Sequence, residues 1–177
     1  FDWGWARWVP AWHTTTTPKG TINTPAGIVV RLGGRTIYHL GDTALFSDLA
    51  LPGRRDALDL ALVPIGGHYT MDRFDAVVAA ELLGAPQIVP IHYDTFPPIE
   101  TDAQSFAADV EGAGTASVEV LAPGATLELR IYSDAAHWSE FTTTVPESVG
   151  GANDKQVVFD YATPSSTGGG GADFTED

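Results

Sequence analysis

Apolar residues along the chain gather in short runs that predict β-strands. Runs at 28–32 and 36–40 flank Gly33 and Gly34, a two-glycine turn that tolerates positive φ, and together they predict a β-hairpin. The segments "ALDLALVPIGG" and "QIVPIHY" are continuous apolar runs, as expected of buried strands. Near the end, "ASVEVLAPGATLELR" predicts two short strands around a Pro-Gly turn.

Two further segments carry helix signals. The stretch "DRFDAVVAAELL" predicts a helix from Asp72 to Leu83, with Asp72 as its N-cap and Gly84 as its C-cap. A second helix is expected from about Asp102 to Val110. Because strands and helices alternate along the chain, the pattern predicts an α/β fold.

Polar side chains with metal-binding chemistry fall at or just after the expected strand ends. The early segment "WARWVPAWH" predicts a strand that ends at His13, and Asp42, His68 and His92 follow later apolar runs. In open α/β sheets, ligands bind at the carboxyl ends of the strands. Imidazole and carboxylate ligands suit zinc, manganese or iron. No compact spacing such as HExxH ties the four residues together, so packed histidines and a turn-forming aspartate remain an equal interpretation.

Composition narrows the chemistry. The 177 residues suffice for about one domain, and the absence of cysteine leaves histidine and carboxylate as the metal ligands. The net charge of −14 argues against a nucleic-acid partner, which requires a basic surface. No apolar run reaches the ~20 residues that cross a bilayer, and no secretory signal is recognisable. We therefore expect a cytoplasmic, acidic protein with no membrane partner.

Three blocks resemble a known family. "GDTALFSD", "PIGGHYTM" and "PIHYDTFP", in this order, resemble the metal-dependent hydrolases of the metallo-β-lactamase superfamily, in the uncharacterised branch close to the ascorbate-phosphate lactonases. The similarity covers about residues 1 to 129. It implies an αββα sandwich, of which this chain carries mainly the second αβ half. The HxHxDH motif of the family is missing, since no HxH occurs in the sequence.

The resemblance assigns roles to individual residues. His13 in "AWHTTTT" and His92 in "IHY" match histidine ligands of the first and second metal, and Asp42 in "GDT" matches the aspartate that bridges both. Gly41 is expected to let the backbone pack closely behind the site. His68 in "GGHYTM" is expected to contact substrate or to donate a proton to the leaving group. Its alternative is a loop histidine that hydrogen-bonds the backbone, and His39 is expected to be a packed strand residue.

The implied function is metal-dependent hydrolysis. A metal-bound hydroxide would attack an ester, lactone or phosphodiester-like small-molecule substrate, with Asp42 and His68 as catalytic residues. The implied cofactor is a divalent metal, with Zn²⁺ favoured over Mn²⁺ or Fe²⁺ and two ions in the complete fold. The alternative is an inactive or partner-dependent metal-binding remnant of the same fold. We also expect His13, Asp42 and His92 to converge within about 5 Å of one another, as ligands of shared ions must.

The two ends of the chain differ in character. Residues 1–130 are expected to form the partial hydrolase domain, and residues 131–177 a divergent, flexible and acidic extension, to which "KQVVFDYA" would add one strand. The start is crowded with Trp3, Trp5, Trp8 and Trp12. Such a segment exposes apolar area unless it is covered. The chain is therefore expected to form a homo-oligomer or to pair with the missing N-terminal half.

Overall fold

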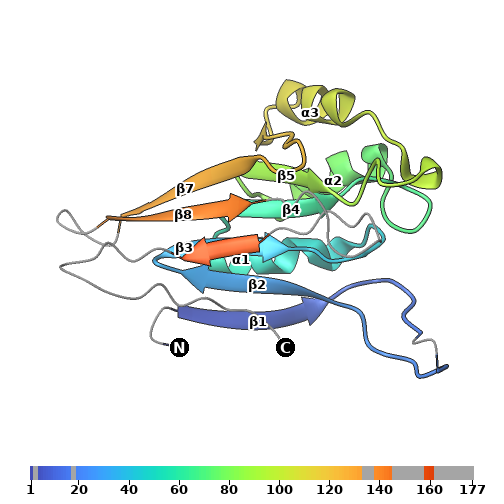
Figure 1. Ribbon diagram of the computed structural model, residues 1–177, viewed down its shortest axis with the longest axis horizontal. Coiled ribbons are helices and arrows are strands. Elements are labelled where there is room, and N and C mark those ends of the chain that lie inside the picture. The colour runs from blue at the N-terminus through green and yellow to red at the C-terminus, as the bar shows by residue number, and fades with distance from the viewer. Residues whose placement is uncertain (2–3, 17–18, 133–137, 145–157, 162–177) are drawn as a thin grey trace.

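The structure is a computed structural model that describes residues 1, 4–16, 19–132, 138–144 and 158–161. Its main sheet has six strands in sequential order (Figure 1). The first three strands pair antiparallel and the remaining pairs are parallel. In chain order they are β1 (Gly4–Pro10), β2 (Ala26–Leu32), β3 (Arg35–His39), β4 (Leu60–Pro64), β5 (Gln87–Ile91) and β6 (Ser117–Val118).

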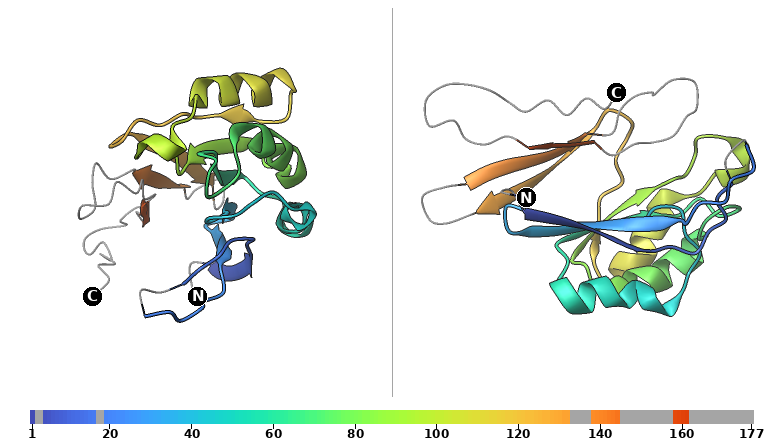
Figure 2. Two further views of the ribbon diagram at one scale, coloured as in Figure 1. Left: turned by 90° about the vertical axis from the view of Figure 1, so that its right-hand side faces the viewer. Right: turned by 90° about the horizontal axis from the view of Figure 1, so that it is seen from below.

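Helices cover one face of this sheet, and a smaller antiparallel sheet covers the other (Figure 2). The helices are α1 (Ala50–Asp56), α2 (Arg73–Leu83) and α3 (Ala103–Gly112), with short 3₁₀ turns η1 (Ser47–Leu49) and η2 (Pro97–Ile99). The second sheet consists of β7 (Thr126–Tyr132), β8 (Trp138–Thr144) and β9 (Val158–Tyr161). The α/β architecture expected from the sequence is confirmed.

The central strands are buried on both faces, which explains their continuous apolar sequence. In β4, Ala61 and Val63 belong to the core beneath the helices, whereas Leu60 and Leu62 belong to a second core on the opposite face. Leu121 joins the second core, and Leu127 of β7 packs against it. Alternate residues of one strand therefore hold the helices and the second sheet in place.

Local signals set the ends of α2 as the sequence predicts. The Asp72 carboxylate accepts hydrogen bonds from the backbone N–H groups of Phe74 and Asp75, both at 2.9 Å. Gly84 ends the helix with φ of 61°. The expected β2–β3 hairpin is also present, with Gly33 and Gly34 at positive φ.

The strand expected to reach His13 is shorter than predicted. β1 pairs with β2 only as far as Pro10 opposite Ala26. Beyond it, the Trp12 backbone N–H donates to the Thr43 hydroxyl at 2.9 Å rather than to a neighbouring strand. His13 therefore lies in a loop three residues after the strand, where a tertiary contact replaces sheet pairing.

Helix α1 was not predicted, because Pro52 and Gly53 interrupt its sequence. Pro52 lies in the first turn of α1. Backbone N–H groups in that turn have no hydrogen-bond partner within the helix, so the absence of an N–H on proline costs no helical hydrogen bond. Gly53 lets α1 approach α2, since a Cβ at that position would lie 2.1 Å from the Leu83 carbonyl oxygen. The close packing of α1 against α2 therefore explains the presence of Gly53, a residue that argues against a helix when the sequence is read alone.

The described residues contain no helix with the length and apolar character of a transmembrane segment. Strands β8 and β9 fall within the range expected to form a C-terminal extension, and β9 overlaps the strand expected in "KQVVFDYA". Residues 131–132 belong to β7, and residues 133–137, 145–157 and 162–177 lie outside the described residues, so the division at residue 130 and the character of the extension stay predictions.

Candidate metal centre

The loop after β3 carries Asp42 on a tightly packed backbone. Gly41 adopts φ of 66°, a left-handed conformation that favours glycine. A Cβ on Gly41 would lie 2.7 Å from the Ala26 carbonyl oxygen. The expected close packing at Gly41 is therefore present, and it holds the next residue, Asp42, with its side chain half exposed to solvent.

The loop after β5 carries His92, also in a left-handed conformation, with φ of 55°. Asp94 follows with φ of 59°. Non-glycine residues are uncommon in this region, and each instance costs about 1–3 kcal/mol, so it persists only where the surrounding structure imposes it. The presence of two such residues after β5 indicates that tertiary contacts hold this loop in its conformation.

His92 and Asp42 approach each other from the loops after β5 and β3, the two strands on either side of β4. His92 Nε2 lies 3.8 Å from Asp42 Oδ1, beyond hydrogen-bond range. His92 is 23% exposed, and its other ring nitrogen, Nδ1, is buried without a hydrogen-bond partner in the described part of the chain. Such an orphaned polar atom is unusual in a folded protein.

This pair fits a divalent metal. Two ligands that each lie about 2.0–2.2 Å from one ion stand apart by roughly the separation seen here, and nitrogen with carboxylate oxygen suits zinc. Among the described residues, however, no group of three or more His, Asp or Glu side chains is arranged to hold a metal ion. The structure brings together two of the three predicted ligands.

His13 lies beside the Asp42 loop. The Ala44 N–H donates to the Trp12 carbonyl oxygen at 2.8 Å, and with the Trp12–Thr43 bond this fixes the residue before His13 against the residues after Asp42. His13 Nδ1 lies 2.7 Å from the Thr14 carbonyl oxygen. A carbonyl only accepts, so Nδ1 carries the proton and Nε2 offers its lone pair. The role of His13 as a ligand stays a prediction.

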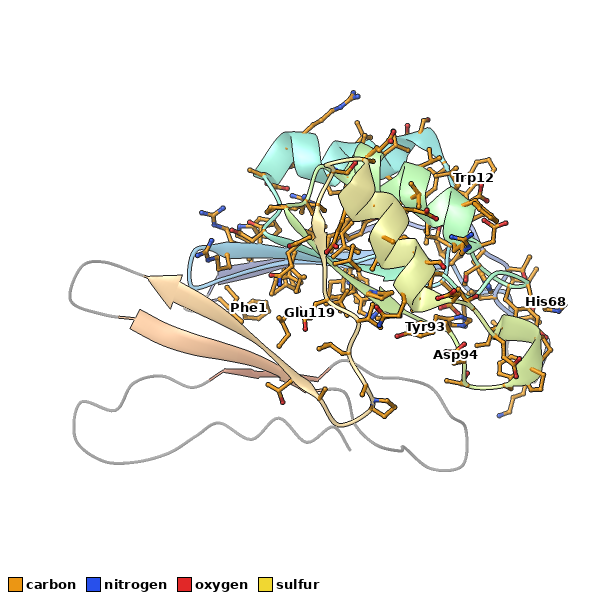
Figure 3. The ribbon with its side chains drawn as sticks, turned by 90° about the horizontal axis from the view of Figure 1, so that it is seen from above. Phe1, Trp12, His68, Tyr93, Asp94 and Glu119 are labelled. Carbon is orange, nitrogen blue, oxygen red and sulfur yellow. The ribbon has the colours of Figure 1, made fainter. Side chains whose placement is uncertain are left out.

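The His68 loop joins the same edge of the sheet. The Met71 N–H donates to the Thr43 carbonyl oxygen at 3.1 Å, and the Gly67 N–H donates to the Met71 carbonyl oxygen at 2.9 Å. His68 is exposed, with φ of 54°, and its ring meets the ring of Tyr69 edge-on at 4.4 Å. Figure 3 shows His68, Trp12 and Asp94 at one end of the molecule, opposite Phe1. The catalytic role of His68 stays a prediction.

His39 has a specific contact that sequence reasoning missed. It was expected to be a packed strand residue, and its Nδ1 in fact accepts a hydrogen bond of 3.0 Å from the Gly41 N–H. Burial lowers the pKa of His39, an effect that the nearby Asp42 carboxylate opposes. The neutral imidazole therefore anchors the turn that presents Asp42. The sequence offered one signal for this contact, namely that His39 lies only three residues before Asp42.

A hollow among the described residues lies elsewhere. This hollow of about 180 Å³ opens beside α1 and is lined by residues that include Arg7, Tyr38, Phe46 and Leu51. It contains none of the predicted site residues. We place the candidate centre at the Asp42–His92 pair because a histidine nitrogen and a carboxylate oxygen approach each other there to 3.8 Å, whereas the hollow contains none of the predicted ligands.

Comparisons with known proteins point to one group. Residues 6–93 match the beta-lactamase superfamily domain. A UPF0173 metal-dependent hydrolase of Thermus thermophilus is 52% identical over 130 residues, which cover 73% of this chain and 57% of that protein. The chain thus spans little more than half the length of the curated relatives it matches.

Solved structures agree with the sequence relatives. Igni18, a metallo hydrolase from the archaeon Ignicoccus hospitalis, superimposes with a TM-score of 0.63 and 41% identity, over 69% of this chain and 51% of that one. The metallo-beta-lactamase fold protein YhfI of Bacillus subtilis superimposes with a TM-score of 0.50 and 13% identity, over 66% and 46% of the two chains. The second likeness concerns the fold alone.

Proposed function

Since the chain belongs to the metallo-β-lactamase superfamily, we propose that it is a metal-dependent hydrolase that acts on an ester, lactone or phosphodiester-like small molecule. The relatives named as metal-dependent hydrolases support the reaction class. The acidic charge of the chain supports a partner other than nucleic acid. A cytoplasmic location and self-association belong to the same proposal.

Asp42 and His92 would hold the metal, with Zn²⁺ favoured, and His13 Nε2 would add a further ligand. When bound, a divalent metal activates water and polarises the bond to be cleaved. The chain's own residues have other tasks. Gly41 and His39 orient Asp42, and the packed backbone around His92 aims its ring. His68, exposed at the same edge, would contact substrate or donate a proton to the leaving group.

The observation that carries this proposal is the approach of His92 Nε2 to Asp42 Oδ1 at 3.8 Å. The test is zinc content after dialysis and zinc affinity by calorimetry, for the chain and for Asp42→Asn and His92→Ala. Each substitution should weaken zinc binding at least tenfold. Asp75→Asn, an exposed carboxylate on α2, serves as the control and should bind zinc as the unmodified chain does. Equal affinity in all four proteins would refute the metal centre.

Hydrolysis is tested separately. The zinc-loaded chain is assayed against an ester, a lactone and a phosphodiester, each with and without the His92→Ala substitution. Turnover that disappears with His92→Ala would support the proposed reaction. Turnover that persists unchanged would place the activity elsewhere.

A second candidate is a metal-binding remnant that requires a partner for activity. It is favoured by the finding that the described residues bring only two predicted ligands together. On this alternative, zinc binds weakly and none of the three substrates is hydrolysed by the chain alone. Addition of a companion segment that bears HxHxDH would then raise both zinc affinity and turnover.

A further inference from the structure

Three exposed aromatic side chains lie on the loops that follow β1, β4 and β5, at the same end of the main sheet as the candidate centre. Trp12 is 66% exposed, Tyr69 52% and Phe96 41%. We call these three residues the aromatic rim. Exposed large aromatics are unfavourable in water, and a group of them beside polar ligands is typical of a binding site.

The rim is held in place by contacts to the loops of the centre. Trp12 is fixed by its two backbone hydrogen bonds to residues 43 and 44, and its ring stacks on Phe46 at 6.0 Å with an interplanar angle of 16°. The Tyr69 ring lies 6.1 Å from the Phe96 ring. The rim residues therefore present fixed ring faces and edges at the end of the sheet that carries Asp42 and His92.

The loops around the centre lack positive charge. The segments 11–16, 40–48, 65–72 and 92–101 contain no lysine or arginine, whereas the exposed side chains in them include Asp42, Asp48, Asp72, Asp94 and Glu100. The cations next to these segments in the sequence are Lys19 and Arg73. Arg73 pairs with Asp109 and lies over the Phe74 ring, and Lys19 lies in the hairpin beyond the Thr16–Ile22 bridge.

From the rim and the charge together, we propose that the substrate carries a flat, uncharged or cationic ring next to the bond that is cleaved, and that it carries no phosphate or carboxylate. This inference rests on the proposed hydrolase function and narrows its substrate from an ester, lactone or phosphodiester to an ester or lactone. Aromatic side chains bind a ring through its faces and edges. A bound metal would attract one anionic group at the bond that is cleaved, but a further phosphate or carboxylate would be repelled by the acidic loops and would find no basic side chain among them.

The first test compares three esters with the same type of leaving group. Benzyl acetate carries a neutral ring, 4-(acetoxymethyl)benzoate carries the same ring with a carboxylate, and ethyl acetate has no ring. With the zinc-loaded chain, kcat/KM for benzyl acetate should exceed both of the others by at least tenfold. Equal values for benzyl and ethyl acetate, or a preference for the carboxylate, would overturn the inference and leave the hydrolase proposal intact.

Two tryptophan variants locate the ring site. Trp12→Ala should lower kcat/KM for benzyl acetate about five- to tenfold more than that for ethyl acetate, mainly through KM. Trp8→Ala is the matched control, because Trp8 is 75% exposed but lies within β1 rather than in the rim. Equal losses in both variants, or an equal loss with both esters in Trp12→Ala, would overturn the assignment of the rim.

A binding measurement separates this inference from the proposed reaction. The alcohol 2-naphthalenemethanol is not hydrolysed, and its binding is followed by NMR titration of the unmodified chain, Trp12→Ala and Trp8→Ala. Binding that weakens about fivefold or more only in Trp12→Ala supports the rim even if no ester is turned over, in which case the hydrolase proposal alone fails. Equal binding in all three proteins overturns the rim.

Discussion

The loops that carry Asp42 and His92 reach the same left-handed backbone conformation by different routes. After β3 the conformation falls on Gly41, which adopts it without steric penalty. After β5 it falls on His92 and Asp94, which adopt it only because their surroundings impose it. The first loop is shaped by its own sequence and the second by tertiary contacts.

The contacts that shape the second loop are specific. The Asp94 N–H donates to the Ile99 carbonyl oxygen at 3.0 Å, and the Asp94 carboxylate accepts from the Thr101 N–H at 2.8 Å. Behind the loop, Gly66 leaves room for the His92 carbonyl. Substitutions outside the His92 loop should therefore disturb that loop, whereas the Asp42 loop should be disturbed mainly by substitutions of its own residues.

The largest effect is expected from Gly66→Ala. A Cβ at this position would lie 2.2 Å from the His92 carbonyl oxygen, so the His92 loop must move. We expect the free energy of unfolding to fall by about 3 kcal/mol, the upper part of the usual range for overpacking. Urea unfolding measures it, with Gly112→Ala as control, because that glycine has open space around it in α3. A loss below about 1 kcal/mol would show that the loop adapts.

A smaller effect is expected from Gly41→Ala. The new Cβ meets the Ala26 carbonyl at 2.7 Å, and alanine in the left-handed region costs about 1–2 kcal/mol. We expect a loss of about 2 kcal/mol in unfolding free energy, measured in urea. Gly34→Ala controls for the conformation alone, since Gly34 has φ of 86° and nothing near its Cβ position. Equal losses in the two variants would remove close packing as a factor.

Asp94 allows the hydrogen bond and the conformation to be tested together. Asp94→Ala removes the acceptor for the Thr101 N–H and should reduce the unfolding free energy by about 1 kcal/mol. Asp94→Asn keeps an acceptor and tolerates positive φ, so its loss should be about half or less. Thermal unfolding of both variants decides between them. If Asp94→Asn is as unstable as Asp94→Ala, the negative charge of Asp94 stabilises the loop, rather than its ability to accept a hydrogen bond.

The smallest effect concerns pH and the first loop. Burial lowers the pKa of His39 from its ordinary 6.5, so the unfolded state binds a proton more readily than the folded state. The contribution of neutral His39 to stability is therefore complete above pH 6.5 and falls as the pH decreases from 6.5 to the lowered value. His39→Asn retains an acceptor for Gly41 and cannot titrate. Urea unfolding between pH 7.5 and 5 should show a steeper decline for the unmodified chain, and parallel curves would contradict this.

Much of the fold was predictable because its signals are local. The capped helix α2, the two-glycine hairpin and the apolar runs of β4 and β5 depend on neighbouring residues, and all of them appear in the structure. The errors share a cause. His13 was placed at a strand end, but the end of β1 depends on a tertiary contact between Trp12 and Thr43. Helix α1 was missed because its Gly53 serves the close packing of α1 against α2.

The candidate site divides in the same way. The sequence by itself supplied residue types at strand ends and three motif blocks, and these selected the family, Asp42 and His92. Only the tertiary structure decided that Asp42 and His92 approach each other, that His39 anchors Gly41, and that Trp12, Tyr69 and Phe96 are exposed. Local signals act over one turn or one strand, whereas a site between strands depends on distances set by sheet pairing and by both packed faces.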